Sequence, residues 1–371
     1  MAYRIAHIAD VHLDMAFLSH GSDGGRRRKE LQDSFERALR VARERNVDAL
    51  CIAGDLYEDG RAGPDRAQYL HRVLGALHPI RVFLAPGNHD PLTPSSVYRQ
   101  MQPLPGNVVV FDRRAFGRVQ LTDDVALWGF GHQHPADRDP AIGNLRCDGA
   151  GTHLLLFHGS DRDAMPPGKE AVAPFSGDEI VRAGAVHAMV GHFHGMLRGK
   201  RHAYPGSLEP HNFAQDGRHT MSFVTVDGGR VDVEFVDANR VRYADLAVDV
   251  SPYADRSALA AAIAERLASL GADAEHLYAR VRLAGVALPS LDVDLVFLGD
   301  ALQPRFGDVE FVEDHVAFDF DAVLDEGRTV RSEFVREMRK RIDGAAGDDR
   351  ALLERALSYG MLAFAGRTIP E

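Results

Sequence analysis

Five short polar motifs, each directly after an apolar run, carry the side chains best suited to chemistry. In chain order they are Asp10-Val11-His12, Gly54-Asp55, Gly87-Asn88-His89-Asp90, Phe157-His158-Gly159 and Gly191-His192-Phe193-His194. Carboxylates, imidazoles and an amide oxygen together suit divalent cations such as Mn²⁺, Fe²⁺ or Zn²⁺. One such motif alone is a weak signal, because Gly-Asn and Gly-Asp are common turn sequences. Five in order at predicted strand ends are hard to obtain by accident, so we predict a metal site.

The candidate ligands are too many for one ion and suit two ions that share a carboxylate. They are Asp10, His12, Asp55, Asn88, His158, His192 and His194. Two divalent ions about 3.5–4 Å apart stabilise in-line displacement at phosphorus. We therefore expect two divalent cations, with Mn²⁺ first and Fe²⁺, Zn²⁺ and Mg²⁺ as alternatives.

The third motif also contains His89 and Asp90, which the ligand set does not need. A histidine beside the metals can donate a hydrogen bond or a proton near the leaving oxygen. Asp90 is the next residue and could orient the imidazole. We predict both His89 and Asp90 as catalytic residues.

The elements around these motifs must bring several strand ends to one place. Apolar runs predict strands at residues 4–9, 47–53 and 80–85, and amphipathic spacing predicts helices at 26–45 and 64–77. Alternating strands and helices imply parallel strands with crossover helices. In such sheets, sites gather beyond the carboxyl ends of the strands.

The rest of the chain is predicted to form a β-rich middle and a different C-terminal part. Strands are predicted at 107–112, 119–122, 125–130, 153–157 and 186–190, followed by a hairpin of 221–226 and 231–236. Beyond residue 240 we predict a helix at 257–270 capped by Ser257, strands at 278–283 and 309–312, and helices at 291–302, 330–342 and 348–364. The predicted domains are residues 1–240, 241–327 and 328–371.

Composition narrows the class of protein. The formal net charge of −11 counts mildly against DNA as a substrate, although two bound cations would add strong local positive charge. Cys51 and Cys147 are far apart and lack a CxxC partner, so we expect a reducing compartment and a cytoplasmic protein. No run approaches the ~18 apolar residues of a membrane span, and we expect no membrane partner.

In order and spelling, the five motifs resemble those of the calcineurin-like metallophosphoesterase superfamily, which run DxH, GD, GNHD, H and GHxH. The resemblance implies an α/β (α+β) fold, a four-layer αββα sandwich, with a small C-terminal α/β capping domain and terminal helices. It also implies the ligand sets of the two ions. One ion would take Asp10, His12, Asp55 and His194, and the other Asp55, Asn88, His158 and His192.

Three stretches are similar to one branch, the SbcD/YhaO-type DNA repair exonucleases. They are Asp10-Val11-His12-Leu13-Asp14, Ala53-Gly54-Asp55-Leu56-Tyr57 and Tyr204-Pro205-Gly206-Ser207. This similarity implies a DNA exonuclease whose helices at 328–371 dock on an SbcC-like ABC ATPase, with a homodimer through the nuclease domain as a further expectation. The chain has Glu58 where relatives often carry Asp or His. The alternatives are a phosphodiesterase or phosphatase on small nucleotides, and a non-catalytic tether between DNA ends and an ATPase.

Basic residues close to the last motif could bind substrate. Arg198, Lys200 and Arg201 follow His194, so we expect them to flank the metals and contact phosphates. His211 follows the Pro-Gly turn and is expected at the edge of the same cleft.

Overall fold

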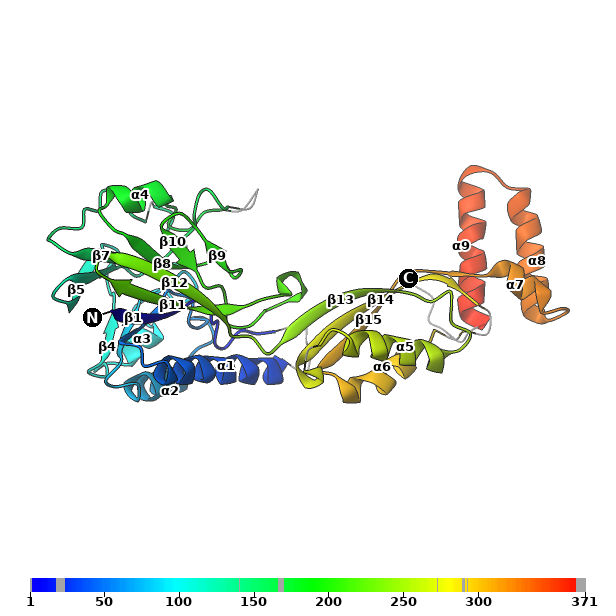
Figure 1. Ribbon diagram of the computed structural model, residues 1–371. Coiled ribbons are helices and arrows are strands. Elements are labelled where there is room, and N and C mark those ends of the chain that lie inside the picture. The colour runs from blue at the N-terminus through cyan, green and yellow to red at the C-terminus, as the bar shows by residue number, and fades with distance from the viewer. Residues whose placement is uncertain are drawn as a thin grey trace. The chain divides into compact units, whose positions relative to one another are not determined.

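The computed structural model describes residues 2–17, 24–139, 141–165, 170–271, 273–288, 291 and 293–364, except for the side chains of 313–315. The chain divides into two compact units, Met1–Arg240 and Val241–Glu371. All predicted metal ligands lie in the first unit, several of whose strands and helices are labelled in Figure 1.

The first sheet carries three of the five motifs. Its strand order is β12-β11-β1-β2-β3-β4. The strands are β1 (Tyr3–Ile8), β2 (Ala49–Ile52), β3 (Arg81–Leu84), β4 (Val108–Val110), β11 (Thr220–Asp227) and β12 (Arg230–Asp237). The first four are parallel, as predicted, and the predicted hairpin β11–β12 joins them antiparallel beside β1. Three of the motifs therefore emerge at the same edge, from β1, β2 and β3.

Helices cover one face of this sheet, because their apolar residues recur on one side. They are α1 (Gly24–Glu44), α2 (Pro64–Gly75) and the short α3 (Val97–Gln100). Leu31 and Phe35 of α1 are buried, and Phe35 shares a core with Ile8 and Leu50 of the sheet. Burying such a side chain contributes roughly 1.5–3 kcal/mol. The packing of α1 thus fixes the sheet whose strand ends form the site.

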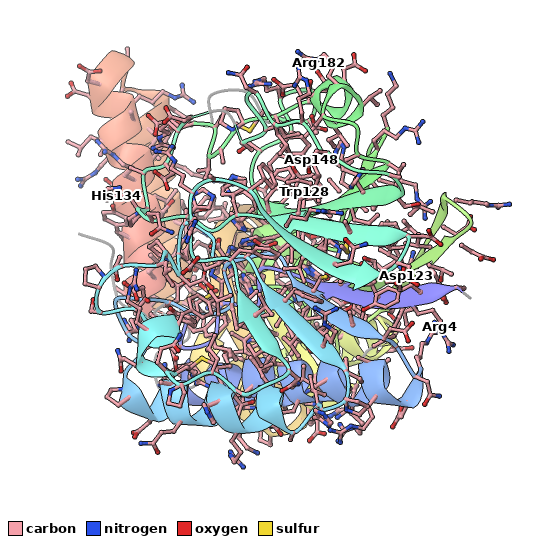
Figure 2. All side chains as sticks on the ribbon, turned by 90° about the vertical axis from the view of Figure 1, so that its left-hand side faces the viewer. Arg4, Asp123, Trp128, His134, Asp148 and Arg182 are labelled. Atoms are coloured by element: carbon pink, nitrogen blue, oxygen red, sulfur yellow. The ribbon has the colours of Figure 1, made fainter. Side chains whose placement is uncertain are left out.

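The second sheet carries the other two motifs, in the order β5-β6-β7-β8-β10-β9. Its strands are β5 (Gly117–Thr122), β6 (Val125–Gly129), β7 (Thr152–His158), β8 (His187–Gly191), β9 (Leu197–Arg198) and β10 (His202–Tyr204). Strands β6, β7 and β8 are parallel, so His158 and His192 follow neighbouring strand ends. Trp128 of β6 is visible in this sheet in Figure 2.

The two sheets face each other across an apolar core, and helices lie outside them. Ile5 of the first sheet packs with Leu127, Leu154 and Met189 of the second. On the outer side of the second sheet, Ile180 of α4 (Gly177–Arg182) packs in a separate cluster. Because β7 is covered on both faces, all seven of its residues are buried. The order of layers is αββα, which confirms the predicted fold class.

The second unit contains a smaller, all-parallel sheet in the order β13-β14-β15. Its elements are β13 (Arg242–Asp249), α5 (Arg256–Ala268), β14 (Leu277–Ala287), α6 (Leu295–Leu302) and β15 (Asp308–Phe318). Strand β13 was not predicted. The predicted cap of α5, Ser257, is wrong: the carboxylate of Asp255 accepts hydrogen bonds from the backbone N–H groups of Ser257 and Ala258, each at 2.9 Å.

Three helices end the described chain: α7 (Phe320–Asp325), α8 (Val330–Asp343) and α9 (Gly347–Phe364). Val335, Met338 and Ile342 of α8 pack against Leu357 and Met361 of α9. Much of the apolar face predicted on these helices is therefore used to hold them together. Among the residues the structure describes, no helix combines the length and the apolar character needed to cross a membrane.

Candidate metal centre

The backbone of the motifs is forced into unusual conformations where the strands end. Asp10, His12 and Asp55 have positive φ angles of 51°, 51° and 49°, and His192 has 114°. Such conformations cost of order 1–3 kcal/mol at non-glycine residues and cluster at functional sites. Hydrogen bonds from Asp10 N to Gly54 O (3.1 Å) and from His12 N to Asp55 O (2.9 Å) hold the first two motifs together.

Asp55 lies at the centre of the cluster. Its Oδ2 is 3.3 Å from Nε2 of His158 and 3.8 Å from Nε2 of His12. Its Oδ1 accepts a hydrogen bond from the backbone N–H of His89 at 2.8 Å. A Cβ on Gly87 would collide with this carboxylate, so only glycine fits there. One carboxylate oxygen thus faces histidines from both predicted ligand sets, as a shared ligand requires.

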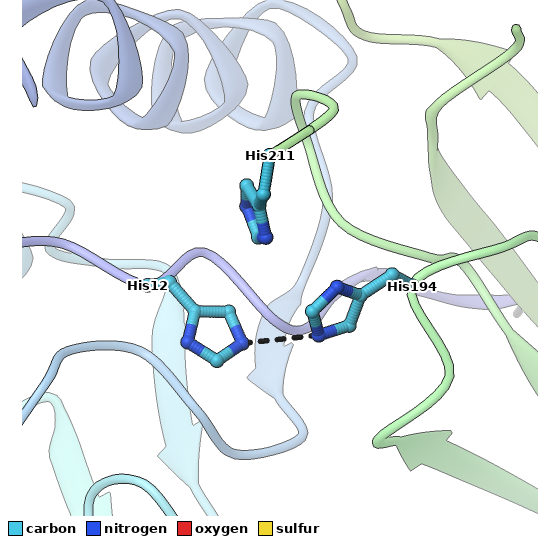
Figure 3. A group of neighbouring side chains, drawn as sticks. All are labelled: His12, His194 and His211. Atoms are coloured by element: carbon cyan, nitrogen blue, oxygen red, sulfur yellow. Dashed lines mark hydrogen bonds between the residues drawn. The ribbon is translucent and has the colours of Figure 1, made fainter. Parts of the chain in front are cut away.

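The first predicted ligand set is completed by His12 and His194. Their Nε2 atoms are 3.2 Å apart, as the dashed line in Figure 3 shows. Nδ1 of His12 lies 2.6 Å from Oε1 of Glu58. Because Nδ1–H donates to this carboxylate, the lone pair on Nε2 faces the cluster, which is the usual arrangement of a metal-bound histidine.

The second predicted set has the same construction. Nε2 of His158 lies 3.0 Å from Oδ1 of Asn88, and Nδ1 of His158 donates to the carbonyl oxygen of Ala53 at 2.9 Å. The His192 ring lies 5.2 Å from the His158 ring, measured between centroids. Both carboxylate oxygens of Asp10 accept from the backbone N–H of His192 at 3.0 Å. All seven predicted ligands are brought together.

The chemistry of these donors fits two divalent ions. Burial raises the pKa of Asp10 to about 6 and lowers the pKa of His192 and of His194 to about 3. Those two imidazoles are therefore neutral at pH 7 and can ligate. Burial alone would lower the pKa of His158, but the charge of Asp55 outweighs it and raises that pKa to about 9. Without metal, His158 thus supplies positive charge beside the buried Asp55, and a bound cation would replace its proton and take over that role.

His89 lies at the rim of the cluster, with 46% of its side chain exposed. Its Nδ1 is 3.1 Å from Oε2 of Glu58, and its ring centroid is 4.8 Å from that of His12. The hydrogen bond to Glu58 raises the pKa of His89 to about 9. The imidazole is therefore protonated at neutral pH and can donate a proton to a group bound above the ligands.

Asp90 does not orient His89, contrary to our expectation. Its buried carboxylate accepts hydrogen bonds from the backbone N–H groups of Gly87 (2.6 Å), Asp55 (3.0 Å) and Leu56 (2.7 Å), and from the hydroxyl of Tyr98 (2.5 Å). Asp90 thus fixes the loops that carry the ligands. The carboxylate that orients His89 is Glu58, a role that the sequence did not reveal.

The expectation that Arg198, Lys200 and Arg201 flank the metals is wrong. The chain leaves His194 along β9 and returns along β10, where Ala203 lies opposite Met189 of β8. The intervening turn is consequently level with the start of β8, at the end away from the ligands. These basic residues line a separate pocket with His187, His202 and Arg230.

His211 lies beside the predicted ligands and not at an exposed edge of the cleft, and its contact with substrate stays a prediction. Its side chain is buried, with 4% exposed, and its ring lies against the rings of His12 and His194. The sequence Gly131-His132-Gln133-His134 copies the spelling of the last motif but plays another part. His132 is buried and bonds the carbonyl of His158 at 2.9 Å, while His134 is on an exposed loop (Figure 2).

The family assignment follows from the part of the chain that contains this cluster. A family model for the calcineurin-like phosphoesterases matches residues 3–195, more than half of the chain. The chain belongs to the calcineurin-like phosphoesterase family. It is therefore a metal-dependent hydrolase, and its seven converging ligands suit two divalent ions that share Asp55.

Two relatives extend the similarity beyond the family model. The chain is 25% identical over 298 residues to the uncharacterized metallophosphoesterase YhaO of Bacillus subtilis, covering 76% of this chain and 71% of YhaO. It is 30% identical over 263 residues to the DNA double-strand break repair protein Mre11 of Methanopyrus kandleri, covering 63% of this chain. The matched region spans 56% of that Mre11, less than two thirds of its length.

Solved structures also resemble this phosphoesterase. The protein TT1561 of Thermus thermophilus aligns over 63% of this chain and 99% of its own, with 12% identity and a TM-score of 0.37. A dimetal phosphatase from Danio rerio aligns over 64% of this chain and 99% of its own, with 11% identity and a TM-score of 0.36.

Proposed function

We propose that this phosphoesterase is a di-metal dependent DNA exonuclease that acts in DNA repair. The observation that carries the proposal is the position of His89, which Glu58 holds at the exposed rim of seven converging ligands. A proton donor in this place suits cleavage of a phosphodiester, because the leaving alkoxide must be protonated.

In this proposal, seven residues hold the two ions and His89 donates a proton. One ion would be held by Asp10, His12, Asp55 and His194, and the other by Asp55, Asn88, His158 and His192. Two ions bound there would supply Lewis-acid chemistry at a phosphoryl oxygen and make water more acidic. His89 donates a proton to the leaving oxygen, while Glu58 holds its imidazole in position and keeps it charged.

DNA as the substrate is supported by similarity rather than by charge. The Mre11 relative is a DNA double-strand break repair protein and matches 63% of this chain at 30% identity. The ion for the assay is Mn²⁺, the first choice for this mixed set of oxygen and nitrogen donors.

The test is hydrolysis of end-labelled linear single-stranded DNA by metal-free protein reloaded with Mn²⁺. We expect shortening of the linear strand from an end, no cleavage of closed circular single-stranded DNA, and loss of the shortening with His89→Asn. Absence of DNA cleavage together with rapid hydrolysis of a cyclic nucleotide or an aryl phosphate would overturn the exonuclease proposal.

A phosphodiesterase for small nucleotides is the second candidate. The basic residues Lys200 and Arg201 lie in the turn 199–201, at the end of β8 and β10 away from the ligands. They are therefore not placed to hold a DNA strand at the metal site, which favours a small substrate. The net charge of −11 points the same way, because a long polyanion is repelled by it. The same assay compares the two, as kcat/KM on DNA against kcat/KM on cyclic nucleotides.

We further propose an SbcC-like ABC ATPase as the partner of α8 and α9. Their facing residues hold the two helices together, but Val330 and Leu352 remain 78% and 59% exposed. Exposed apolar side chains on a helical hairpin suit a partner groove. Leu352→Glu is expected to abolish co-purification with the ATPase while leaving hydrolysis of a small phosphodiester unchanged.

The third candidate is a non-catalytic tether between DNA ends and an ATPase. It is favoured if Mn²⁺-loaded protein hydrolyses no phosphoester even with its ATPase.

A further inference from the structure

His211 is a buried imidazole for which the described part of the chain offers no hydrogen-bond partner on either ring nitrogen. Only 4% of the residue is exposed, so bulk solvent does not reach these nitrogens. Buried polar atoms are almost always paired, because an unpaired one loses its hydration without compensation. An imidazole with two unpaired nitrogens beside the predicted metal ligands therefore needs an explanation.

The ring of His211 faces two of the predicted metal ligands. Its centroid lies 5.0 Å from that of His12 and 4.9 Å from that of His194. One nitrogen from each of the three rings lies within 4.8 Å of the others. Figure 3 shows the three rings converging, with His211 approaching from a separate loop. Three imidazoles around one space are a common arrangement for a transition-metal ion.

The loop that carries His211 is tied to the ligand it faces. The backbone N–H of His211 donates to the side-chain oxygen of Gln215 at 2.9 Å, and the amide nitrogen of Gln215 lies 2.8 Å from Nδ1 of His194. Gln215 ends the short 3-10 helix η2 (Phe213–Gln215), which Asn212 caps through the N–H of Ala214 at 2.9 Å. One side chain thus sets the relative position of His211 and His194.

We propose that His211 is a third imidazole ligand of the cation held by His12 and His194. This inference rests on the metal pair of the proposed function and adds a residue outside its seven ligands. The added nitrogen makes this position richer in imidazole than the one formed by Asp55, Asn88, His158 and His192. Imidazole suits Zn²⁺, Fe²⁺ and Co²⁺ better than Mg²⁺ or Mn²⁺, so the two positions differ in ion preference.

The test is Co²⁺ binding to metal-free protein, followed by equilibrium dialysis with metal analysis and by visible absorption. The variants are His211→Leu and His211→Gln. The matched control is His153→Gln, which also removes a buried histidine but one whose nitrogens contact Gly149 O (3.1 Å) and Trp128 Nε1 (3.2 Å). His153 lies near the start of β7, at the end away from His158.

Wild-type protein and His153→Gln are expected to bind two Co²⁺ per chain. Both His211 variants should bind one of the two at least about tenfold more weakly, since even residues behind a ligand cost 10–100-fold. Their visible spectrum should change, and Mn²⁺ binding should weaken by less. Without metal, His211→Leu should unfold at the same temperature as wild type or higher, because leucine removes two unpaired nitrogens.

Unchanged Co²⁺ affinity and an unchanged spectrum in both His211 variants, beside two ions in the wild type, would overturn the role of His211 alone. Fewer than two Co²⁺ in the wild-type protein would overturn the metal pair, and with it the proposed function. Equal losses in His153→Gln and the His211 variants would also overturn the inference, because the effect would then be one of general packing.

Discussion

Nδ1 of His89 lies 3.1 Å from one carboxylate oxygen of Glu58, whose other oxygen lies 2.6 Å from Nδ1 of His12. A single carboxylate therefore holds both the proposed proton donor and a predicted metal ligand. Burial alone would raise the pKa of Glu58, but hydrogen bonds with the two histidines outweigh it and lower the pKa to about 2. Glu58 stays ionised over the whole neutral range.

Replacing Glu58 by glutamine should affect metal binding and turnover together. The amide cannot carry the negative charge that stabilises both histidines. We expect the affinity for one of the two cations to fall roughly 10–100-fold, as for other residues that orient a metal-bound histidine. Equilibrium dialysis with metal analysis measures this, and Glu179→Gln, a change in α4, is the control. Wild-type affinity in Glu58→Gln would contradict the role we assign to this carboxylate.

Asp55→Ala should lose both ions, because its carboxylate faces histidines of both ligand sets. Metal analysis after gel filtration tests this directly. The control is Asp178→Ala, which removes an exposed carboxylate paired with Lys200 at 2.8 Å. Retention of one full equivalent of metal in Asp55→Ala would show that the carboxylate serves a single position.

His89→Asn should keep both ions and lose most hydrolysis. Its side chain is at the rim and belongs to neither predicted ligand set, and a positioned general acid contributes typically about 10²–10⁴-fold to the rate. The measurements are metal content and kcat on a phosphodiester whose leaving group is poor. A variant with near-normal kcat would place the proton donor elsewhere.

Asp90→Asn should destabilise the protein. Its carboxylate accepts hydrogen bonds from three backbone N–H groups and from the Tyr98 hydroxyl. In the Asp90→Asn variant the side-chain NH₂ is itself a donor, so it would face some of these donors and leave them without an acceptor. We expect the free energy of unfolding in urea to fall by about 1–3 kcal/mol. Tyr98→Phe removes only one of the four bonds and should cost less. Equal stability of Asp90→Asn and wild type would refute the structural role of this carboxylate.

Mild acid should weaken the fold through His7. Burial, helped by the nearby His187, lowers the pKa of His7 to about 3, so its imidazole is neutral in the folded state. In the unfolded chain it protonates below about pH 6.5, so its contribution to stability is complete above that pH and is lost as the pH falls towards 3. At pH 5.5 the loss is about 1.4 kcal/mol.

Urea unfolding of metal-free protein at pH 7.5 and pH 5.5 measures this effect. The fall in unfolding free energy between the two conditions should be smaller in His7→Gln than in wild type by about 1.4 kcal/mol. An identical fall in the two proteins would show that His7 does not resist protonation in the folded state.

The ligands could be predicted from the sequence because each follows an apolar run that forms a parallel strand. Once the strands share one direction, their ends must meet, and Asp10, Asp55 and His158 meet as expected. The turn at residues 199–201 was misplaced because β9 and β10 have only two and three residues, too few to show a period. The role of Asp90 could not be predicted because its partners are mostly backbone N–H groups, which any residue type other than proline can supply.

The C-terminal part shows a similar limit. Strand β13 was missed because its sequence, Arg-Tyr-Ala-Asp-Leu-Ala-Val-Asp, mixes charged and apolar residues where it pairs on one side only with β14. Glu58 differs from the residue types that are common in relatives, but that difference does not show its partners, because its hydrogen bonds reach residues 46 and 31 positions away in the chain. Long-range pairs of this kind are invisible to any local pattern.

The positive φ angles of Asp10, His12 and Asp55 cost conformational energy at residues that the proposed activity needs. Glycine at any of these positions would remove the backbone strain but also the metal ligand, so the variant would be more stable and inactive. A screen for heat resistance alone would be drawn towards such changes, so selections on this scaffold need a catalytic readout at every round.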